Sequence, residues 1–185
     1  MSDIWLITGG ARSGKSAYAE ELAMNIGRVL YIATGVACDD EMIERIERHR
    51  QNRPKDWITW ERYRDLADIE NEFDANTFDV ILLDCAGNLL MGILFEEVPD
   101  ADDFTTIDFE RVERLSISEI DALCAFAARH DKRLIFVTNE IGMGIVPDTL
   151  YSRCYRDALG RINKHTAKAS DNVVLMVTGL PLKLK

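Results

Sequence analysis

The segment Gly-Gly-Ala-Arg-Ser-Gly-Lys-Ser at residues 9–16 constrains the fold of this chain more than any other. It directly follows the apolar run Ile4–Ile7. It also fits the pattern of a glycine, four residues of any kind, then glycine, lysine and serine or threonine. In this pattern a buried strand leads into a loop whose backbone N–H groups surround phosphate oxygens, and a helix follows. We therefore expect a strand, a phosphate-binding loop and a helix in this order.

The residues of this loop have distinct expected roles. Lys15 is expected to reach the β- and γ-phosphates of a nucleotide and to take part in catalysis, and the Ser16 hydroxyl is expected to bind Mg²⁺. Asp84 follows the buried run Val80–Leu83 and is expected to be a second Mg²⁺ ligand, because an acidic residue at a strand end holds the metal in such proteins. The loop residues predicted to bind nucleotide are Gly9, Gly10, Ala11, Arg12, Ser13, Gly14, Lys15 and Ser16.

Apolar runs of strand length alternate with longer helical patterns along the rest of the chain. This alternation predicts an α/β fold of the P-loop NTPase type, with a mostly parallel β-sheet and helices on both faces. The expected strands are Ile4–Ile7, Val29–Ala33, Val80–Leu83, Leu134–Val137 and Val173–Val177, with a further extended piece at Trp57–Glu61. The expected helices are Ser16–Gly27, a helix from Asp39 or Asp40 to about Gln51, Asp108 to about Arg129, and one from Pro147 to about Ala169. A surface loop is expected at Phe95–Phe104.

Length and composition bound the class of protein. The 185 residues, 47% of them hydrophobic, fit a single nucleotide-binding catalytic domain over residues 1–185. The net charge of −10 disfavours a nucleic-acid partner, which requires a basic patch. No run approaches the roughly 18 apolar residues of a membrane span, and the first residues lack the basic region of a signal peptide. We therefore do not expect an integral membrane protein. The four cysteines form no CxxC pair, so we expect reduced thiols and a cytoplasmic location.

The segment DDEMIERIERHRQNRP at residues 39–54 carries a histidine among cations. On a helix, Glu41, Arg45 and His49 share one face, and this spacing also suits an ordinary surface helix with ion pairs between successive turns. Arginines at positions 48, 50 and 53 surround His49. Such cations would stabilise developing charge on phosphate oxygens, so the cluster suits a histidine that attacks phosphorus.

With these segments the chain resembles the bifunctional adenosylcobinamide kinase / adenosylcobinamide-phosphate guanylyltransferase family of cobalamin biosynthesis. The resemblance rests on TGGARSGKS, YIATG, DDEMIERIERHRQNRP, WITWE, LLDC, VTNEIGMGIVP, RDALGRIN and TGLPLKLK, which cover nearly the whole chain. The segment with His49 and the segment NEIGMGIVP are highly specific to this family, whereas the phosphate-binding loop is shared by many families.

The resemblance implies two reactions, with Mg²⁺ as cofactor and ATP, GTP, adenosylcobinamide and adenosylcobinamide phosphate as partners. A γ-phosphate from ATP or GTP would pass to the aminopropanol hydroxyl of adenosylcobinamide. His49 would then attack the α-phosphate of GTP, and the GMP on the histidine would pass to adenosylcobinamide phosphate. The resemblance also implies a homotrimer. It further places the guanine nucleotide against Thr34, Gly35, Val36, Arg50, Gln51, Asn52, Arg53, Glu61 and Asp84.

Two segments extend this interpretation. The stretch Ala86–Gly92 departs from the bulkier sequence that the family usually has there, which bears on local packing or on corrinoid contacts. The stretch Thr138–Gly144 follows a buried strand, so it is either a plain turn or a substrate-binding loop, because ligands gather at the carboxyl ends of such strands.

Two other functions are consistent with a phosphate-binding loop. One is a regulatory nucleotide-binding switch that acts through a partner protein, and the other is a simple P-loop kinase without the transferase step. Labelling with α-labelled GTP separates them, since only the bifunctional enzyme forms a covalent adduct.

Overall fold

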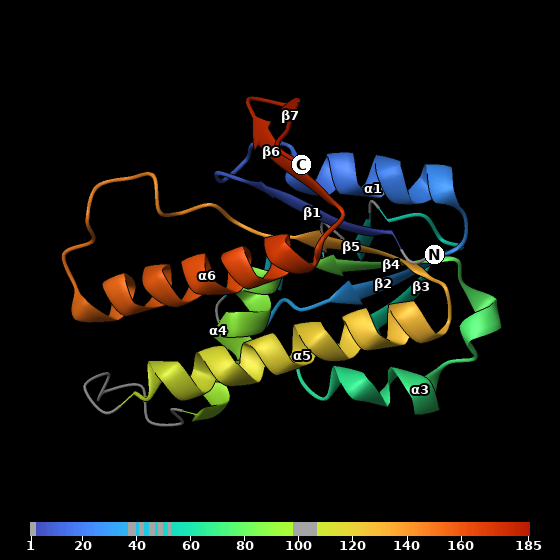
Figure 1. Cartoon of the computed structure of the whole chain (residues 1–185), viewed down its shortest axis with the longest axis horizontal. Helices are drawn as coiled ribbons and strands as arrows, with labels where there is room; N and C mark the ends of the chain where they lie inside the picture. Colours follow the sequence, from blue (N-terminus) through green and yellow to red (C-terminus); the bar gives the residue numbers. More distant parts are fainter. Residues whose placement is uncertain are drawn as a thin grey trace.

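A computed structural model describes residues 3–36, 40, 43, 44, 47, 50, 51, 53–97 and 107–185. A seven-stranded sheet forms the centre of the molecule, with helices packed on both of its faces (Figure 1). In chain order the elements are β1 (Ile4–Gly9), α1 (Lys15–Ile26), β2 (Val29–Ala33), β3 (Ile58–Glu61), η1 (Leu66–Asp68), α3 (Ile69–Glu72), η2 (Ala75–Thr77), β4 (Val80–Asp84), α4 (Ala86–Glu97), α5 (Phe109–Arg129), β5 (Arg133–Val137), α6 (Leu150–Ala169), β6 (Asn172–Val177) and β7 (Leu180–Lys183).

The strand order is β3-β2-β4-β5-β1-β6-β7. Every neighbouring pair is parallel except β6 and β7, which pair antiparallel at one edge. This arrangement confirms the predicted α/β fold with a mostly parallel sheet. Because the strands are parallel, the segments that leave β1, β2, β3, β4 and β5 all begin at the same end of the sheet.

Successive side chains along each strand point to opposite faces of the sheet, and each face has its own core. Leu6, Leu83 and Phe136 belong to the core beneath α4, α5 and α6. Their neighbours Ile7 and Leu82 belong to the core on the face that α1 covers. Both faces are therefore apolar, which explains why the strands read as continuous apolar runs in the sequence.

Helix α5 illustrates why the longer patterns fold as predicted. Asp108 caps its first turn by accepting a hydrogen bond from the Arg111 amide. Val112, Ile120 and Leu123 are buried on one face, at the spacing that places residues of a helix on a common side. The predicted helix at Asp108–Arg129 is thus confirmed, as are those that became α1 and α6.

Five elements were absent from the sequence-based prediction or differ from it. Helix α4 contains the stretch Ala86–Gly92 and extends through Phe95–Glu97, so the loop expected from Phe95 begins too early. The edge strand β7 and the short helices between β3 and β4 were also missed. Within the predicted helix at 40–51, the described residues Asp40, Ile43, Glu44, Glu47, Arg50 and Gln51 are helical.

No helix in the described part of the chain combines the length and the apolar character that a membrane crossing requires.

Candidate active site

The loop between β1 and α1 has the backbone of a phosphate-binding loop. Gly9 and Gly14 have φ angles of 152° and 93°, a region that glycine adopts readily and other residues rarely do. A Cβ atom on Gly9 would lie 2.5 Å from the Met176 carbonyl oxygen of β6, so this position also requires a residue without a side chain. The exposed residues Gly10, Ala11 and Arg12 form the outer part of the loop.

Helix α1 begins without a side-chain cap. Its N-cap residue is Gly14, which has no side chain to accept hydrogen bonds from the first turn. By contrast, Asp108 caps α5 and Thr149 caps α6. The positive end of α1 therefore faces the loop without a protein anion, which is the arrangement that favours a bound phosphate.

Lys15 and Ser13 both point into this loop. Lys15 is buried, and its Nζ atom donates a hydrogen bond to the Gly10 carbonyl oxygen at 2.6 Å. The Ser13 hydroxyl is also buried, and within the described part of the chain it has no hydrogen-bond partner. Ser16, the second residue of α1, is partly buried beside them. The loop thus concentrates a cation and polar hydrogens where phosphate oxygens are expected.

Asp84 ends β4 at the same end of the sheet. The Tyr31 hydroxyl of β2 donates a hydrogen bond to Asp84 Oδ2 at 3.1 Å, which holds the carboxylate at a fixed angle. Burial raises the pKa of the neighbouring Cys85 thiol to about 11, and the nearby Lys15 charge partly opposes this rise. Lys15 and the end of β4 are therefore close enough to interact electrostatically, as a nucleotide site between them requires.

Thr34 is fully buried, and its hydroxyl holds the backbone that follows Asp84. It donates to the Cys85 carbonyl oxygen at 2.8 Å and accepts from the Cys85 amide at 2.7 Å. These contacts make Thr34 a structural residue that fixes the end of β4 from the end of β2. The next residues of the predicted set, Gly35 and Val36, are partly exposed beside it.

The described residues among the remaining predicted nucleotide residues lie at the edge of the sheet around β3. Arg50 pairs with Glu61, donating from Nη2 and, at 3.2 Å, from Nε. The Arg53 guanidinium lies 3.7 Å above the centre of the Tyr31 ring and donates to the Thr59 hydroxyl at 3.0 Å. Gln51 is exposed. His49 and Asn52, the other predicted residues of this segment, lie outside the described residues.

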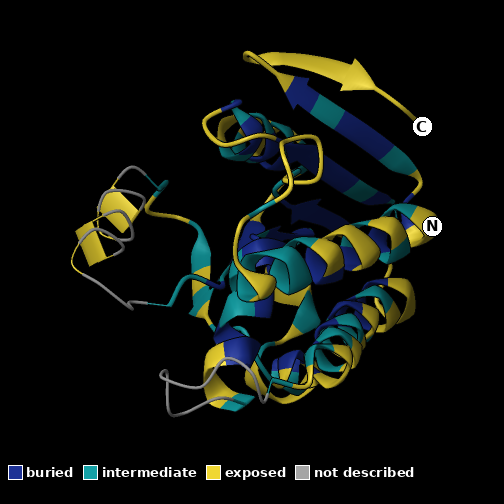
Figure 2. Cartoon of the chain, turned by 90° about the vertical axis from the view of Figure 1, so that its left-hand side faces the viewer, coloured by how far each residue is buried: buried dark blue, intermediate teal, exposed yellow. Residues whose placement is uncertain are grey.

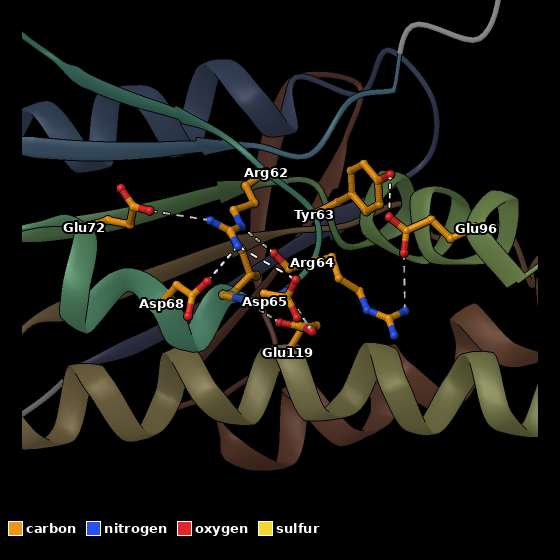
Figure 3. A network of polar contacts seen from close by, with 9 residues as sticks. Arg62, Tyr63, Arg64, Asp65, Asp68, Glu72, Glu96 and Glu119 are labelled. Carbon is orange, nitrogen blue, oxygen red and sulfur yellow. Dashed lines mark hydrogen bonds and ion pairs between the residues drawn. The ribbon is translucent and has the colours of Figure 1, made fainter.

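A polar network fixes the segment that leaves Glu61 (Figure 3). Arg62 pairs with Asp68 at 2.7 Å, and the Tyr63 hydroxyl donates to Glu96 of α4 at 2.8 Å. Glu119 of α5 accepts from the backbone amides of Asp65 and Leu66. A cavity of about 430 Å³ opens beside Glu61 within this network. A second cavity of about 310 Å³ lies by Glu70 and His130 and contains none of the predicted site residues.

The stretch Ala86–Gly92 packs beneath this network. A Cβ atom on Gly92 would lie 2.5 Å from the Tyr63 ring, so the glycine leaves room for the tyrosine. Tyr155 of α6 donates to the Gly87 carbonyl oxygen at 3.0 Å. The glycines of this stretch therefore allow aromatic side chains to pack closely against it.

Two polar residues near Asp84 were missed from the sequence. Glu20 lies one turn after Ser16 on α1, and burial followed by the charge of Asp84 raises its pKa, while Arg53 opposes the rise. Tyr31 has a raised pKa because it is buried and lies beside Asp84. Glu20 lies in the Ala-Glu pair that follows the loop and is part of the family resemblance, and its spacing of four from Ser16 could have indicated its position, whereas Tyr31 looks like an ordinary strand residue.

The parallel sheet, the glycine-bent loop, the uncapped helix and the buried lysine define this chain as a P-loop nucleotide-binding protein. Residues 5–184 match the family described as cobinamide kinase / cobinamide phosphate guanyltransferase. The chain is 43% identical to the bifunctional adenosylcobalamin biosynthesis protein CobU of Escherichia coli (strain K12), over 97% of this chain and 98% of that protein. It is 39% identical to the bifunctional adenosylcobalamin biosynthesis protein CobP of Pseudomonas aeruginosa, over 97% of this chain and 96% of that protein.

The chain therefore belongs to the cobinamide kinase / cobinamide phosphate guanyltransferase family. It is an enzyme of that family, with nucleotide and cobinamide substrates.

Proposed function

We propose that this chain phosphorylates adenosylcobinamide with ATP or GTP and then transfers GMP from GTP to adenosylcobinamide phosphate through His49. The observation that carries the first half is the loop at residues 9–16, where Lys15 is buried and folded onto the loop backbone. Family membership and the arginine-rich sequence around His49 support the second half.

In the kinase reaction the loop would hold the nucleotide phosphates by its backbone N–H groups, and Lys15 would neutralise charge as the γ-phosphate moves. Ser16 and Asp84 would hold Mg²⁺, which supplies charge neutralisation at the phosphates when it is bound. An alcohol and an aspartate suit this hard cation, which prefers oxygen ligands and keeps several waters. Among the described residues, no group of three or more acidic, histidine or cysteine side chains could hold a metal ion.

In the transferase reaction the His49 imidazole would attack the α-phosphorus of GTP, forming a P–N bond and releasing pyrophosphate. The phosphate oxygen of adenosylcobinamide phosphate would then attack the same phosphorus, and the histidine would leave. Arginines 48, 50 and 53 would stabilise the charge on the phosphate oxygens. Thr34, Gly35, Val36, Gln51, Asn52 and Glu61 complete the proposed guanine nucleotide site. Of these, Thr34 would act by fixing the backbone, since it is fully buried.

The other two histidines have different surroundings. His130 follows α5 and contacts Glu70 at 3.0 Å, at the end of the sheet opposite the phosphate-binding loop. His165 lies on α6 and contacts Asp121 of α5 at 2.7 Å. Both are therefore poorer candidates for the nucleophile. The proposal also includes a homotrimer, which rests on the family resemblance.

Labelling with α-labelled GTP tests the covalent step. Wild-type protein is expected to carry an adduct that is labile in acid and stable in base, as a P–N bond is. His49→Ala should lose the adduct and the transferase activity but keep appreciable kinase activity, because phosphoryl transfer to an alcohol needs no protein nucleophile. The matched variants His130→Ala and His165→Ala should label normally. An acid-labile adduct of equal yield on His49→Ala would refute the assignment.

A further inference from the structure

The segment between β5 and α6 exposes an unusual set of apolar side chains. Met143, Ile145 and Val146 are 79%, 95% and 64% exposed, and Leu150, the first residue of α6, is 61% exposed. The segment leaves the carboxyl end of β5, at the same end of the sheet as the phosphate-binding loop, and arches outward to the start of α6 (Figure 1). Figure 2 faces this end of the molecule and shows the segment as largely exposed. Exposed apolar side chains that gather in one place often mark a site that binds a ligand or another protein.

The first part of this segment is fixed to the phosphate-binding loop. The Glu140 amide donates a hydrogen bond to the Gly9 carbonyl oxygen at 2.9 Å. Asn163 of α6 accepts from the buried Thr138 hydroxyl at 2.7 Å and donates to the Asn139 carbonyl oxygen at 2.9 Å. The backbone that begins the segment is therefore held by three contacts beside the site of phosphoryl transfer.

The last part is fixed as well. Arg153 donates to the carbonyl oxygens of Pro147 and Asp148 at 2.9 Å and 2.8 Å, and Thr149 caps α6. Both ends are thus ordered by hydrogen bonds, while the side chains between them project into solvent. Ile145 is five positions after Glu140, so the exposed centre lies within about 17 Å of that anchor even if the chain between them is fully extended.

We propose that Met143, Ile145 and Val146 form an apolar platform for the corrin ring of the cobinamide substrate. This inference rests on the proposed function. A corrin ring is a broad macrocycle with apolar faces and methyl groups, and its aminopropanol side arm carries the hydroxyl that must reach the γ-phosphate. A surface beside the phosphate-binding loop, but not within it, matches that separation between ring and hydroxyl. Its position at the carboxyl ends of parallel strands is also where open α/β sheets bind ligands.

The test compares two double variants that remove the same kinds of side chain. Met143→Ser/Ile145→Ser alters the proposed platform. Met24→Ser/Leu184→Ser is the matched control, since Met24 and Leu184 are 52% and 59% exposed at the opposite end of the sheet. Binding of cobinamide is measured by equilibrium dialysis, using the visible absorbance of the corrin, and the KM values for cobinamide and ATP are measured beside it.

We expect the platform variant to bind cobinamide at least tenfold more weakly, because two apolar side chains no longer contact the ring. Its KM for ATP and its covalent labelling by α-labelled GTP should match wild type, since neither involves the corrin. Unchanged cobinamide binding would overturn the proposal, as would an equal loss in the control. A fall in assembly mass by analytical ultracentrifugation that accompanies the weaker binding would also overturn it, because the patch would then contact a second copy of the chain. Failure of the wild type to phosphorylate bound cobinamide would instead count against the proposed function.

Discussion

The Thr34 hydroxyl forms two hydrogen bonds with the same residue, Cys85, one to its carbonyl oxygen and one from its amide. All three groups are buried, and the contact joins the ends of β2 and β4 directly beside Asp84. The position of the proposed Mg²⁺ ligand therefore depends on a side chain that itself contacts no solvent.

Thr34→Val tests this contact, because valine has the same shape and lacks the hydroxyl. The substitution leaves the Cys85 amide and carbonyl without this partner, so we expect the free energy of unfolding to fall by about 1–3 kcal/mol. Urea denaturation measures the change. Thr59→Val is the control, since Thr59 is exposed and accepts a surface hydrogen bond from Arg53. Equal stabilities of the two variants would show that the buried hydroxyl has no special role.

Lys15→Ala is expected to reduce nucleotide-dependent turnover by about a hundredfold or more, because a preorganised charge at the transferring phosphate is lost. The protein should stay folded, as the side chain contributes a hydrogen bond to its own loop. Kinase assays and thermal melts are measured together. Lys132→Ala, which removes a lysine bonded to the Phe78 carbonyl oxygen, is the control. Near-normal phosphoryl transfer by folded Lys15→Ala would contradict the assignment of the loop.

Asp84→Asn is expected to raise the Mg²⁺ concentration needed for half-maximal activity, because an amide oxygen binds a hard cation more weakly than a carboxylate. Tyr31→Phe should have a smaller effect in the same direction, since it removes only the hydrogen bond that orients Asp84. Kinase activity titrated with Mg²⁺ compares the two variants. If Asp84→Asn shows the same dependence of kinase activity on Mg²⁺ concentration as the wild type, the carboxylate has a structural role and does not bind the metal.

A pH dependence of stability should arise from Asp79, far from the site. A side-chain hydrogen bond from Arg28, together with one from the Arg28 backbone amide, lowers the pKa of Asp79 to about 2. The ionised form is thus favoured in the folded protein, so its stabilising effect is present above the unfolded pKa near 4 and is lost as the pH falls towards 2. Asp79→Asn should show a weaker decline of stability between pH 4 and pH 2. The pair is largely exposed, so the effect is small and is best measured at low salt, with exposed Asp56→Asn as control.

The sequence predicts the parts of the fold that depend on local pattern. Buried strands such as Val80–Leu83 appear as apolar runs, and α5 appears through its regular spacing of apolar residues. Helix α4 was missed because it is buried on several sides and therefore shows no amphipathic period, and because its two glycines disfavour a helix. Strand β7 was missed because a proline at position 181 is typical of an edge strand and otherwise argues against a strand.

In the candidate site too, residues of a local motif could be predicted from the sequence, whereas contacts between distant residues could not. The loop at residues 9–16 is a contiguous motif, so its glycines and Lys15 could be identified from the sequence alone. The contact of Tyr31 with Asp84 joins residues 53 positions apart, and the burial of Thr34 depends on strand pairing. Neither follows from local sequence, since each exists only after the sheet has formed.

The phosphate-binding loop belongs to the first strand but rests against the last part of the chain. The Met176 carbonyl oxygen lies against Gly9, and the Gly179 amide donates to the Ser13 carbonyl oxygen at 3.0 Å. During translation at about 5–20 residues per second, β1 leaves the ribosome roughly ten to thirty seconds before β6 does. A nascent chain must therefore carry its phosphate-binding motif without the supporting strand for that interval.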